Sequence, residues 1–219
     1  MVTYLITGAN RGIGLEFCRQ LKDSGNDVIA VCREKSPELA NLAVRIEDGV
    51  DIGNDESIAV LKERLEGVAI DVLINNAGIH SRNTLETLDF NDILHQFNIN
   101  SLGALRVTKA LLPNLKSGSK IAIITSRMAS IDDNTSGSSY GYRMSKVALS
   151  MAGKSLAVDL KPKQIPVAIL HPGLVKTRMT NFNGISTTEA VTGLLARIEE
   201  LNLENTGTFW HSNGQVLPW

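Results

Sequence analysis

The chain has 219 residues, of which 43% are hydrophobic and 21% charged, and its formal net charge is −1. This balance is typical of one globular domain with a substantial core, and it excludes the broad positive field that nucleic-acid-binding proteins carry. The first apolar segment is too short to span a bilayer and has no basic leader, while Cys18 and Cys32 cannot make a disulfide framework. We therefore expect a cytoplasmic protein.

Short apolar runs rich in β-branched residues alternate along the chain with amphipathic windows. Because they lack polar alternation, the runs predict strands buried on both faces at 2–7, 27–32, 71–75, 120–125 and 166–170. Weaker strands are expected at 43–50 and 206–212. The amphipathic windows predict helices at 13–23, 55–65, 89–115, 139–160 and 187–201. This order predicts the α/β class: a single-domain (1–219) Rossmann-type doubly wound parallel sheet of about seven strands, with helices on both faces.

The first strand ends in "TGANRGIG", which opens directly into a helix. Glycines at such a turn permit close approach of the backbone, and the helix N-terminus offers free N–H groups to a pyrophosphate. The spacing is GxxxGxG rather than the GxGxxG of the usual dinucleotide fingerprint. The turn nevertheless predicts a nucleotide site that contains Gly8, Asn10, Arg11, Gly12, Ile13 and Gly14.

The second strand ends in "CRE", where an NAD site usually has an acidic residue that holds the ribose 2′-hydroxyl. This chain has Cys32 and then Arg33 there, and Arg11 stands close by in the glycine-rich turn. Two arginines suit the 2′-phosphate of NADP, although most arginines are solvated surface charges and Glu34 partly offsets the charge of Arg33. We expect NADPH/NADP⁺ as the cofactor rather than NAD(H).

Three later strands are also followed by polar or turn-forming residues: "NNAG" after the fourth, "TSRMAS" after the fifth and "HPGLVKT" after the sixth. Ligands of an open parallel sheet bind beyond the carboxyl ends of its strands. The fifth strand is followed by "YGYRMSK", in which Tyr142 precedes Lys146 by one helical turn and so shares a face with it. Tyr140 does not have this spacing. The strand ends together predict one site at this edge.

These motifs, in this order, resemble the short-chain dehydrogenase/reductase family over nearly the whole chain. The segment "SIDDNTSGSSYGYRMSKVAL" and the end "NGQVLPW" are similar to the C-factor-like and sniffer-like carbonyl reductases. The resemblance implies a catalytic tetrad of Asn100, Ser126, Tyr142 and Lys146. Beyond the glycine-rich turn and Arg33, the implied cofactor contacts are Asp51 (adenine), Ile52, Asn76, Ala77, Gly78, Tyr142, Lys146, Pro172, Gly173, Val175 and Thr177 (nicotinamide carboxamide).

Carbonyl reduction explains why such a tetrad is useful. A lysine cation one turn away is expected to stabilise the Tyr142 phenolate and bring its pKa nearer to working pH. Ser126 can donate a hydrogen bond to the developing oxyanion. The interval from Ser126 to Tyr142 is longer than in most of the family, so Ser130 stays open, but Ser126 is favoured because it ends a strand. Asn100 is either the family's helix break that holds a proton-relaying water or a tolerated polar residue.

Two function classes stay open: an NADPH-dependent reductase of a small carbonyl, and an NADP(H)-binding signalling or interaction protein whose turnover is incidental. The complete tetrad favours the enzyme. The four histidines have no metal-ligand spacing, so no metal is expected. The family resemblance implies a homodimer or homotetramer through the helices 89–115 and 139–160. The nearly balanced charge, without a basic run, predicts no nucleic-acid or membrane partner. The short segment after Thr177 predicts a pocket that is open on that side.

Overall fold

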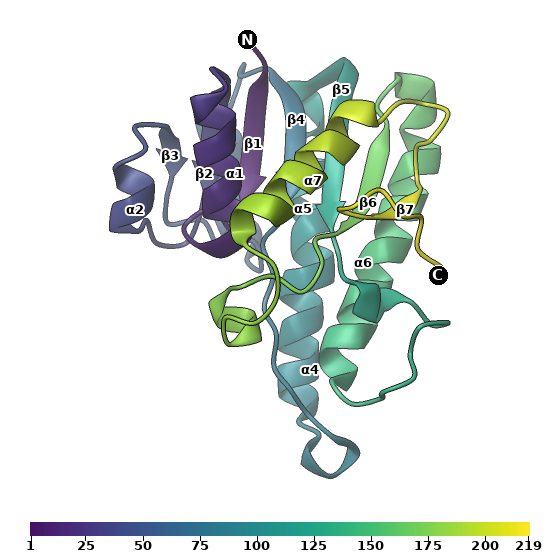
Figure 1. Cartoon of the computed structure of the whole chain (residues 1–219). Helices are drawn as coiled ribbons and strands as arrows, with labels where there is room; N and C mark the ends of the chain where they lie inside the picture. Colours follow the sequence, from purple (N-terminus) through teal and green to yellow (C-terminus); the bar gives the residue numbers. More distant parts are fainter.

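The computed structural model describes residues 1–219 and contains one parallel sheet of seven strands (Figure 1). The strands are β1 (Thr3–Thr7), β2 (Asp27–Val31), β3 (Arg45–Glu47), β4 (Ile70–Asn75), β5 (Leu115–Ile124), β6 (Val167–His171) and β7 (Phe209–His211). Their order in the sheet is β3-β2-β1-β4-β5-β6-β7. The chain first builds outward from β1 to β3 and then returns to place β4 beside β1. This reversal is the topological switch point of a doubly wound sheet, and the predicted Rossmann-type fold is confirmed.

The helices cover both faces of the sheet (Figure 1). They are α1 (Gly12–Asp23), α2 (Pro37–Ala40), α3 (Asp55–Arg64), α4 (Phe90–Phe97), α5 (Ala104–Leu111), α6 (Tyr140–Asp159) and α7 (Thr187–Glu200). Helices α1 and α7 pack together on one face, and α3, α5 and α6 lie on the other, with α4 against α6. The two cores contain 22 and 20 buried residues, so both sheet faces are sealed, as strands without polar alternation require. No helix has the length and apolar character needed to cross a lipid bilayer.

The predicted helix over 89–115 is helical from Phe90 to Asn114, but it is not one regular α-helix. Helix α4 ends at Phe97, a π-helical segment covers Asn98–Gly103, and α5 follows. The wider turn is explained by side chains that bond outside the helix: the Asn98 amide donates to the Gly53 carbonyl at 3.0 Å, and Asn100 bonds to the backbone of Ile79. π-Helical turns of this kind are frequent at functional sites.

The fifth strand also differs from its prediction, because β5 begins at Leu115 and not at 120. Gly118 adopts φ +89°, and the Ser119 hydroxyl accepts from the Lys116 N–H (3.0 Å) and donates to the Ile70 carbonyl (2.8 Å). These bonds keep a polar stretch in the sheet, with a register shift against β4. The short helix α2 was not predicted; Ser36 caps its N-terminus and Pro37 starts it.

Candidate active site

A cavity of about 1050 Å³ lies at the carboxyl ends of the central strands, where the chain reverses its direction across the sheet. Its walls come mainly from the loops that follow β1 to β6. Most of the residues predicted for the cofactor and catalytic sites line it: Gly8, Asn10, Arg11, Gly12, Ile13, Gly14, Arg33, Asp51, Ile52, Asn76, Ala77, Gly78, Tyr142, Lys146, Pro172 and Thr177. Four predicted residues do not line the cavity, namely Asn100, Ser126, Gly173 and Val175.

The glycine-rich turn forms a cradle that larger residues would fill. Gly8 adopts φ +67°, and a Cβ there would stand 2.8 Å from the Ala77 Cα. A Cβ on Gly14 would overlap the Gly8 carbonyl and lie 2.7 Å from the Asn76 amide nitrogen. The first and last glycines of the GxxxGxG pattern, Gly8 and Gly14, are therefore required by close contacts with the neighbouring backbone. Helix α1 begins between them, at Gly12. These residues fit a dinucleotide pyrophosphate.

The "NNAG" turn is fixed directly to the end of β1. The Thr7 hydroxyl accepts from the backbone N–H groups of Asn76 (3.0 Å) and Ala77 (3.1 Å), and the Asn76 amide donates to the Thr7 carbonyl at 2.9 Å. The walls on either side of the switch point are thus joined by three hydrogen bonds. Sequence reasoning gave Thr7 no role because it looked only for groups that face a ligand.

The two arginines predicted for the 2′-phosphate lie in the same part of the cavity wall. Arg11 and Arg33 are both exposed, and Cys32 is buried beside them. Glu34 forms no ion pair with either arginine, and its carbonyl accepts from the Asn10 amide at 2.9 Å, which ties the glycine-rich turn to the loop after β2. The two guanidinium groups therefore present their charge to the cavity without an internal acid partner.

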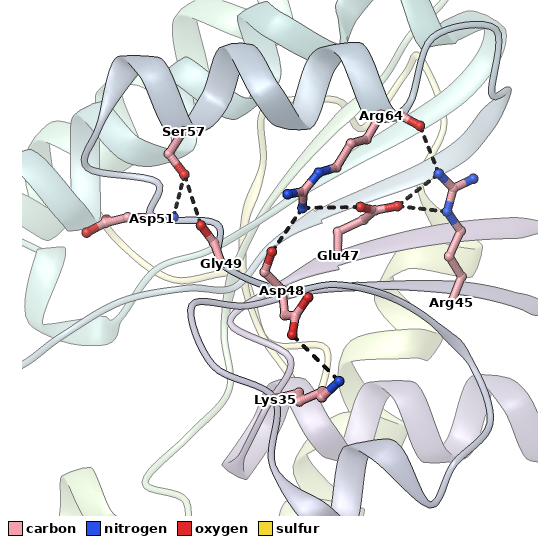
Figure 2. A network of polar contacts seen from close by, with 8 residues as sticks. All are labelled: Lys35, Arg45, Glu47, Asp48, Gly49, Asp51, Ser57 and Arg64. Carbon is pink, nitrogen blue, oxygen red and sulfur yellow. Dashed lines mark hydrogen bonds and ion pairs between the residues drawn. The ribbon is translucent and has the colours of Figure 1, made fainter.

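Asp51 is fixed by the serine of the following helix (Figure 2). The Asp51 backbone N–H donates to the Ser57 hydroxyl at 2.8 Å, and this hydroxyl donates to the Gly49 carbonyl at 3.4 Å. The Asp51 carboxylate accepts from the Gly53 N–H at 2.8 Å. The loop between β3 and α3 thus has a defined shape where it meets the cavity.

A cluster of charged side chains at the end of β3 and on α3 holds the start of the same loop (Figure 2). Glu47, buried at the end of β3, pairs with Arg45 at 2.9 Å and with Arg64 of α3 at 3.6 Å. Arg64 also donates to the Asp48 carbonyl at 2.9 Å, while Asp48 and Lys35 form a looser pair at 3.8 Å. Both carboxylate oxygens of Glu47 are paired, so its burial is compensated and β3 is held against α3.

Tyr142 and Lys146 lie side by side on α6 and face the cavity. Both are buried, with exposed fractions of 8% and 4%, and the lysine Nζ lies 5.8 Å from the centre of the tyrosine ring. The Nζ donates to the Ile124 carbonyl at 3.0 Å. The short stretch "YGYRMSK" therefore contains a buried pair, and Tyr140, by contrast, is exposed.

Burial dominates the titration of this pair, contrary to the expected effect of the lysine. Loss of water raises the pKa of Tyr142 to about 12, while the Ser126 hydroxyl acts in the opposite direction and lowers it. Burial also lowers the pKa of Lys146 to about 8. Desolvation disfavours the charged form of each group, and it is the largest cause of both shifts. Tyr142 is consequently protonated at neutral pH.

Asn100 lies behind the cavity and joins α6 to the loop after β4. Its side chain accepts from the Ile79 N–H at 2.8 Å and donates to the Ile79 carbonyl and the Ser145 hydroxyl, both at 2.9 Å. It is fully buried, and a Cβ on Gly78 would lie 3.1 Å from its Oδ1 and 3.4 Å from the Lys146 Nζ. Asn100 therefore holds the loop after β4 against α6, and its side chain and that of Lys146 both lie close to Gly78. These bonds argue against the interpretation of Asn100 as a merely tolerated polar residue.

The two candidate serines have different surroundings. Ser126 lies two residues beyond the end of β5, accepts from the Met128 N–H at 3.1 Å, and lowers the pKa of Tyr142. Ser130 accepts from the Asp133 N–H at 3.2 Å, as part of the turn that leaves the site. The effect of Ser126 on the pKa of Tyr142 favours Ser126.

Several cavity residues were missed by sequence reasoning. Arg178, Met179 and Phe182 line the cavity from the segment that was expected to leave that side open, and Lys176 lines it just before Thr177. The available signal was the cationic pair on either side of Thr177 in "VKTRM", beside a presumed cofactor contact. His80 was also missed; it lines the cavity directly after "NNAGI".

Residues 2–186 match the family described as short chain dehydrogenase. The chain is 41% identical to a 1-hydroxy-2-glutathionyl-2-methyl-3-butene dehydrogenase of Rhodococcus sp. (strain AD45), over 100% of both chains. It is also 44% identical to the C-signal of Myxococcus xanthus, over 68% of this chain and 93% of that protein.

Solved structures give the same result. The NADPH-bound carbonyl reductase from chicken fatty liver is 31% identical with a TM-score of 0.89, covering 99% of this chain and 98% of that one. The carbonyl reductase Sniffer of D. melanogaster is 29% identical with a TM-score of 0.89, covering 100% of both chains. The chain belongs to the short-chain dehydrogenase/reductase family of oxidoreductases, with similarity to C-signal and to sniffer-type carbonyl reductases.

Proposed function

We propose that this chain is an NADPH-dependent oxidoreductase that interconverts a small carbonyl compound and its alcohol, with cofactor and catalytic residues in one domain, 1–219. The observation that carries the proposal is the buried pair of Tyr142 and Lys146 in the wall of the cavity that contains the glycine cradle. A second structural relative, a putative short-chain dehydrogenase/reductase of Burkholderia multivorans, has NADP bound and is 28% identical with a TM-score of 0.89.

The cofactor would be held along the whole cavity. The glycine cradle and α1 would hold the pyrophosphate, Asp51 and Ile52 the adenine, and Thr177 the carboxamide of the nicotinamide. Arg11 and Arg33 would hold the 2′-phosphate, because guanidinium groups form charge-assisted and bidentate hydrogen bonds with phosphate. The preference for NADPH over NADH rests on these two arginines and on the absence of an acid at the tip of β2.

When bound, the nicotinamide supplies or accepts the hydride. Tyr142 donates its hydroxyl proton to the substrate oxygen as negative charge develops there, and Ser126 donates a hydrogen bond to the same oxygen. The ammonium group of Lys146 stabilises the tyrosinate that is left. Asn100 acts through its bonds to Ile79 and Ser145, which hold α6 and the loop after β4 in register.

The protonation state of Tyr142 favours reduction at neutral pH. A phenol whose pKa is raised to about 12 carries its proton there, and the carbonyl substrate needs that proton. Alcohol oxidation needs the tyrosinate as the base, so its rate should increase as the pH rises.

The relatives point to two further possibilities for the role of the chain. The Rhodococcus relative is a dehydrogenase whose name specifies a glutathionyl substituent, so conjugated alcohols belong in any panel of candidate substrates. The likeness to C-signal favours a second candidate function, an NADP(H)-binding signalling or interaction protein in which turnover is incidental. The complete set of Asn100, Ser126, Tyr142 and Lys146 favours the enzyme.

A homodimer or homotetramer in the cytoplasm is part of the proposal. Helices α4 and α6 pack together and present exposed apolar side chains that a partner subunit would cover. These are Phe90, Leu94, Met144, Met151 and Val158.

The test is cofactor consumption with a panel of aldehydes, ketones, quinones and glutathione-conjugated alcohols, using NADP(H) and NAD(H) in parallel. Turnover with NADP(H) that disappears in Tyr142→Phe, while this variant still binds NADPH, is the expected result. Tight NADPH binding without turnover of any compound would favour the signalling function, and absence of binding would contradict both candidates.

A further inference from the structure

His80 packs against the proposed proton donor. Its ring lies edge-on to the ring of Tyr142, with centroids 4.6 Å apart and planes inclined by 67°. This geometry is a favourable aromatic arrangement, in which the positive edge of one ring meets the face of the other. The histidine also lines the cavity.

The backbone on both sides of this histidine is fixed. The preceding residue, Ile79, is bound through both its N–H and its carbonyl by Asn100. The following residue, Ser81, donates its N–H to the Gln96 side chain at 3.1 Å, and Gln96 is fully buried and donates to Asp92 at 2.9 Å. The backbone that carries the imidazole is therefore held by Gln96 of α4 and by Asn100 of the π-helical segment that follows α4.

The ring nitrogens of His80 do not explain its presence there. Its Nε2 is buried and has no protein hydrogen-bond partner. Burial lowers the pKa of the imidazole, the nearby Arg82 lowers it further, and Asp92 acts in the opposite direction. The side chain is thus a neutral flat ring at neutral pH, and its contact with the phenol is what it contributes.

We propose that His80 is a positioning residue for Tyr142: its ring fixes the plane of the phenol and keeps water from that side of it. The Ser126 hydroxyl lowers the pKa of the phenol, and the Lys146 Nζ lies 5.8 Å from the centre of its ring. His80 is the residue that places a second ring against the phenol. The proposal rests on the proposed function, because it takes Tyr142 to be the proton donor.

Two substitutions separate packing from hydrogen bonding. His80→Ala removes the ring and admits water, and it should lower kcat by about tenfold to a hundredfold, the scale expected when a reacting group is displaced by about 1 Å. The affinity for NADPH should not change. His80→Phe keeps a flat ring against the phenol and should keep kcat within a few-fold of wild type. The control is His95→Ala, which removes an exposed histidine from helix α4 and should have no effect.

A titration of Tyr142 distinguishes the positioning role from a general loss of stability, because a change in stability alone would not shift the pKa of this one tyrosine. The tyrosinate absorbance of each variant is compared with that of the same variant carrying Tyr142→Phe, so that only Tyr142 contributes to the difference. In wild type and His80→Phe its pKa should stay near 12, and in His80→Ala it should fall toward the ordinary value of about 10. Loss of kcat in His80→Phe as large as in His80→Ala, or an unchanged titration and kcat in His80→Ala, would overturn the positioning role. Failure of the proposed function is distinguishable, because Tyr142→Phe alone would then retain activity.

Discussion

Replacing Asn100 with alanine should destabilise the fold by an amount that its contacts define. The change removes hydrogen bonds of 2.8, 2.9 and 2.9 Å and leaves the Ile79 N–H and carbonyl without these partners. A net contribution of about 1 kcal/mol for each bond gives roughly 3 kcal/mol, and any penalty for the unpaired backbone groups adds to it. For a chain of this length that corresponds to a Tm lower by about 6–12 °C.

Urea denaturation with an unchanged m-value measures this loss of stability. Asn75→Ala is the matched control, because it removes a buried asparagine that makes one side-chain bond, to Thr108 at 2.9 Å, and it should cost only about 1 kcal/mol. Activity of Asn100→Ala at a temperature where it is folded should also fall, since the loop after β4 and α6 lose their connection. Equal stability of the two variants would refute the role of Asn100 as a brace.

Three further predictions follow from the site and its surroundings. Ser126→Ala should lower kcat by about a hundredfold, the scale of losing one oxyanion donor, whereas Ser130→Ala should stay near wild type; the reverse result would move the oxyanion contact to Ser130. Alanine at Arg11 or Arg33 should weaken NADPH binding by about tenfold and leave NADH binding unchanged, as measured by titration at low and physiological ionic strength; equal losses for both cofactors would contradict the 2′-phosphate contact. Burial, with a smaller effect of neighbouring positive charge, lowers the pKa of His171 from 6.5 to about 3, so the unfolded chain binds more protons, and stability should fall as the pH decreases from about 6.5 toward 3, by about 2 kcal/mol at pH 5. Substituting glutamine for His171 should flatten that decrease in a denaturation series, and an unchanged slope would contradict the assignment.

The fold was predictable because its signals are local. Uninterrupted apolar runs specify strands buried on both faces, and the alternation with amphipathic windows specifies crossover helices. The glycine cradle was predictable for a related reason, since Gly8 and Gly14 stand where a Cβ would meet backbone or a fixed side chain. A position that cannot hold a Cβ requires glycine, so it can be recognised in the sequence.

What the sequence did not reveal depends on contacts between distant segments. The π-helical turn around Asn100 arises because Asn98 and Asn100 bond to residues on other loops; the family resemblance implied a break at Asn100, but the hydrophobic pattern of 89–115 does not show its extent or its partners. The raised pKa of Tyr142 has the same origin: the spacing to Lys146 is local, but the burial that raises the pKa is not. The packing of His80 against Tyr142 joins residues 62 positions apart, and no motif records it.

The most direct test of the proposed mechanism is single-turnover carbonyl reduction by enzyme saturated with NADPH, comparing wild type, Tyr142→Phe and Tyr140→Phe. The first substitution keeps the ring and its packing and removes only the transferable proton, so we expect NADPH affinity to be retained and reduction to be abolished. Tyr140 is exposed and does not line the cavity, so its substitution should have little effect. Reduction by Tyr142→Phe within a few-fold of wild type would contradict the assignment of Tyr142 as the proton donor.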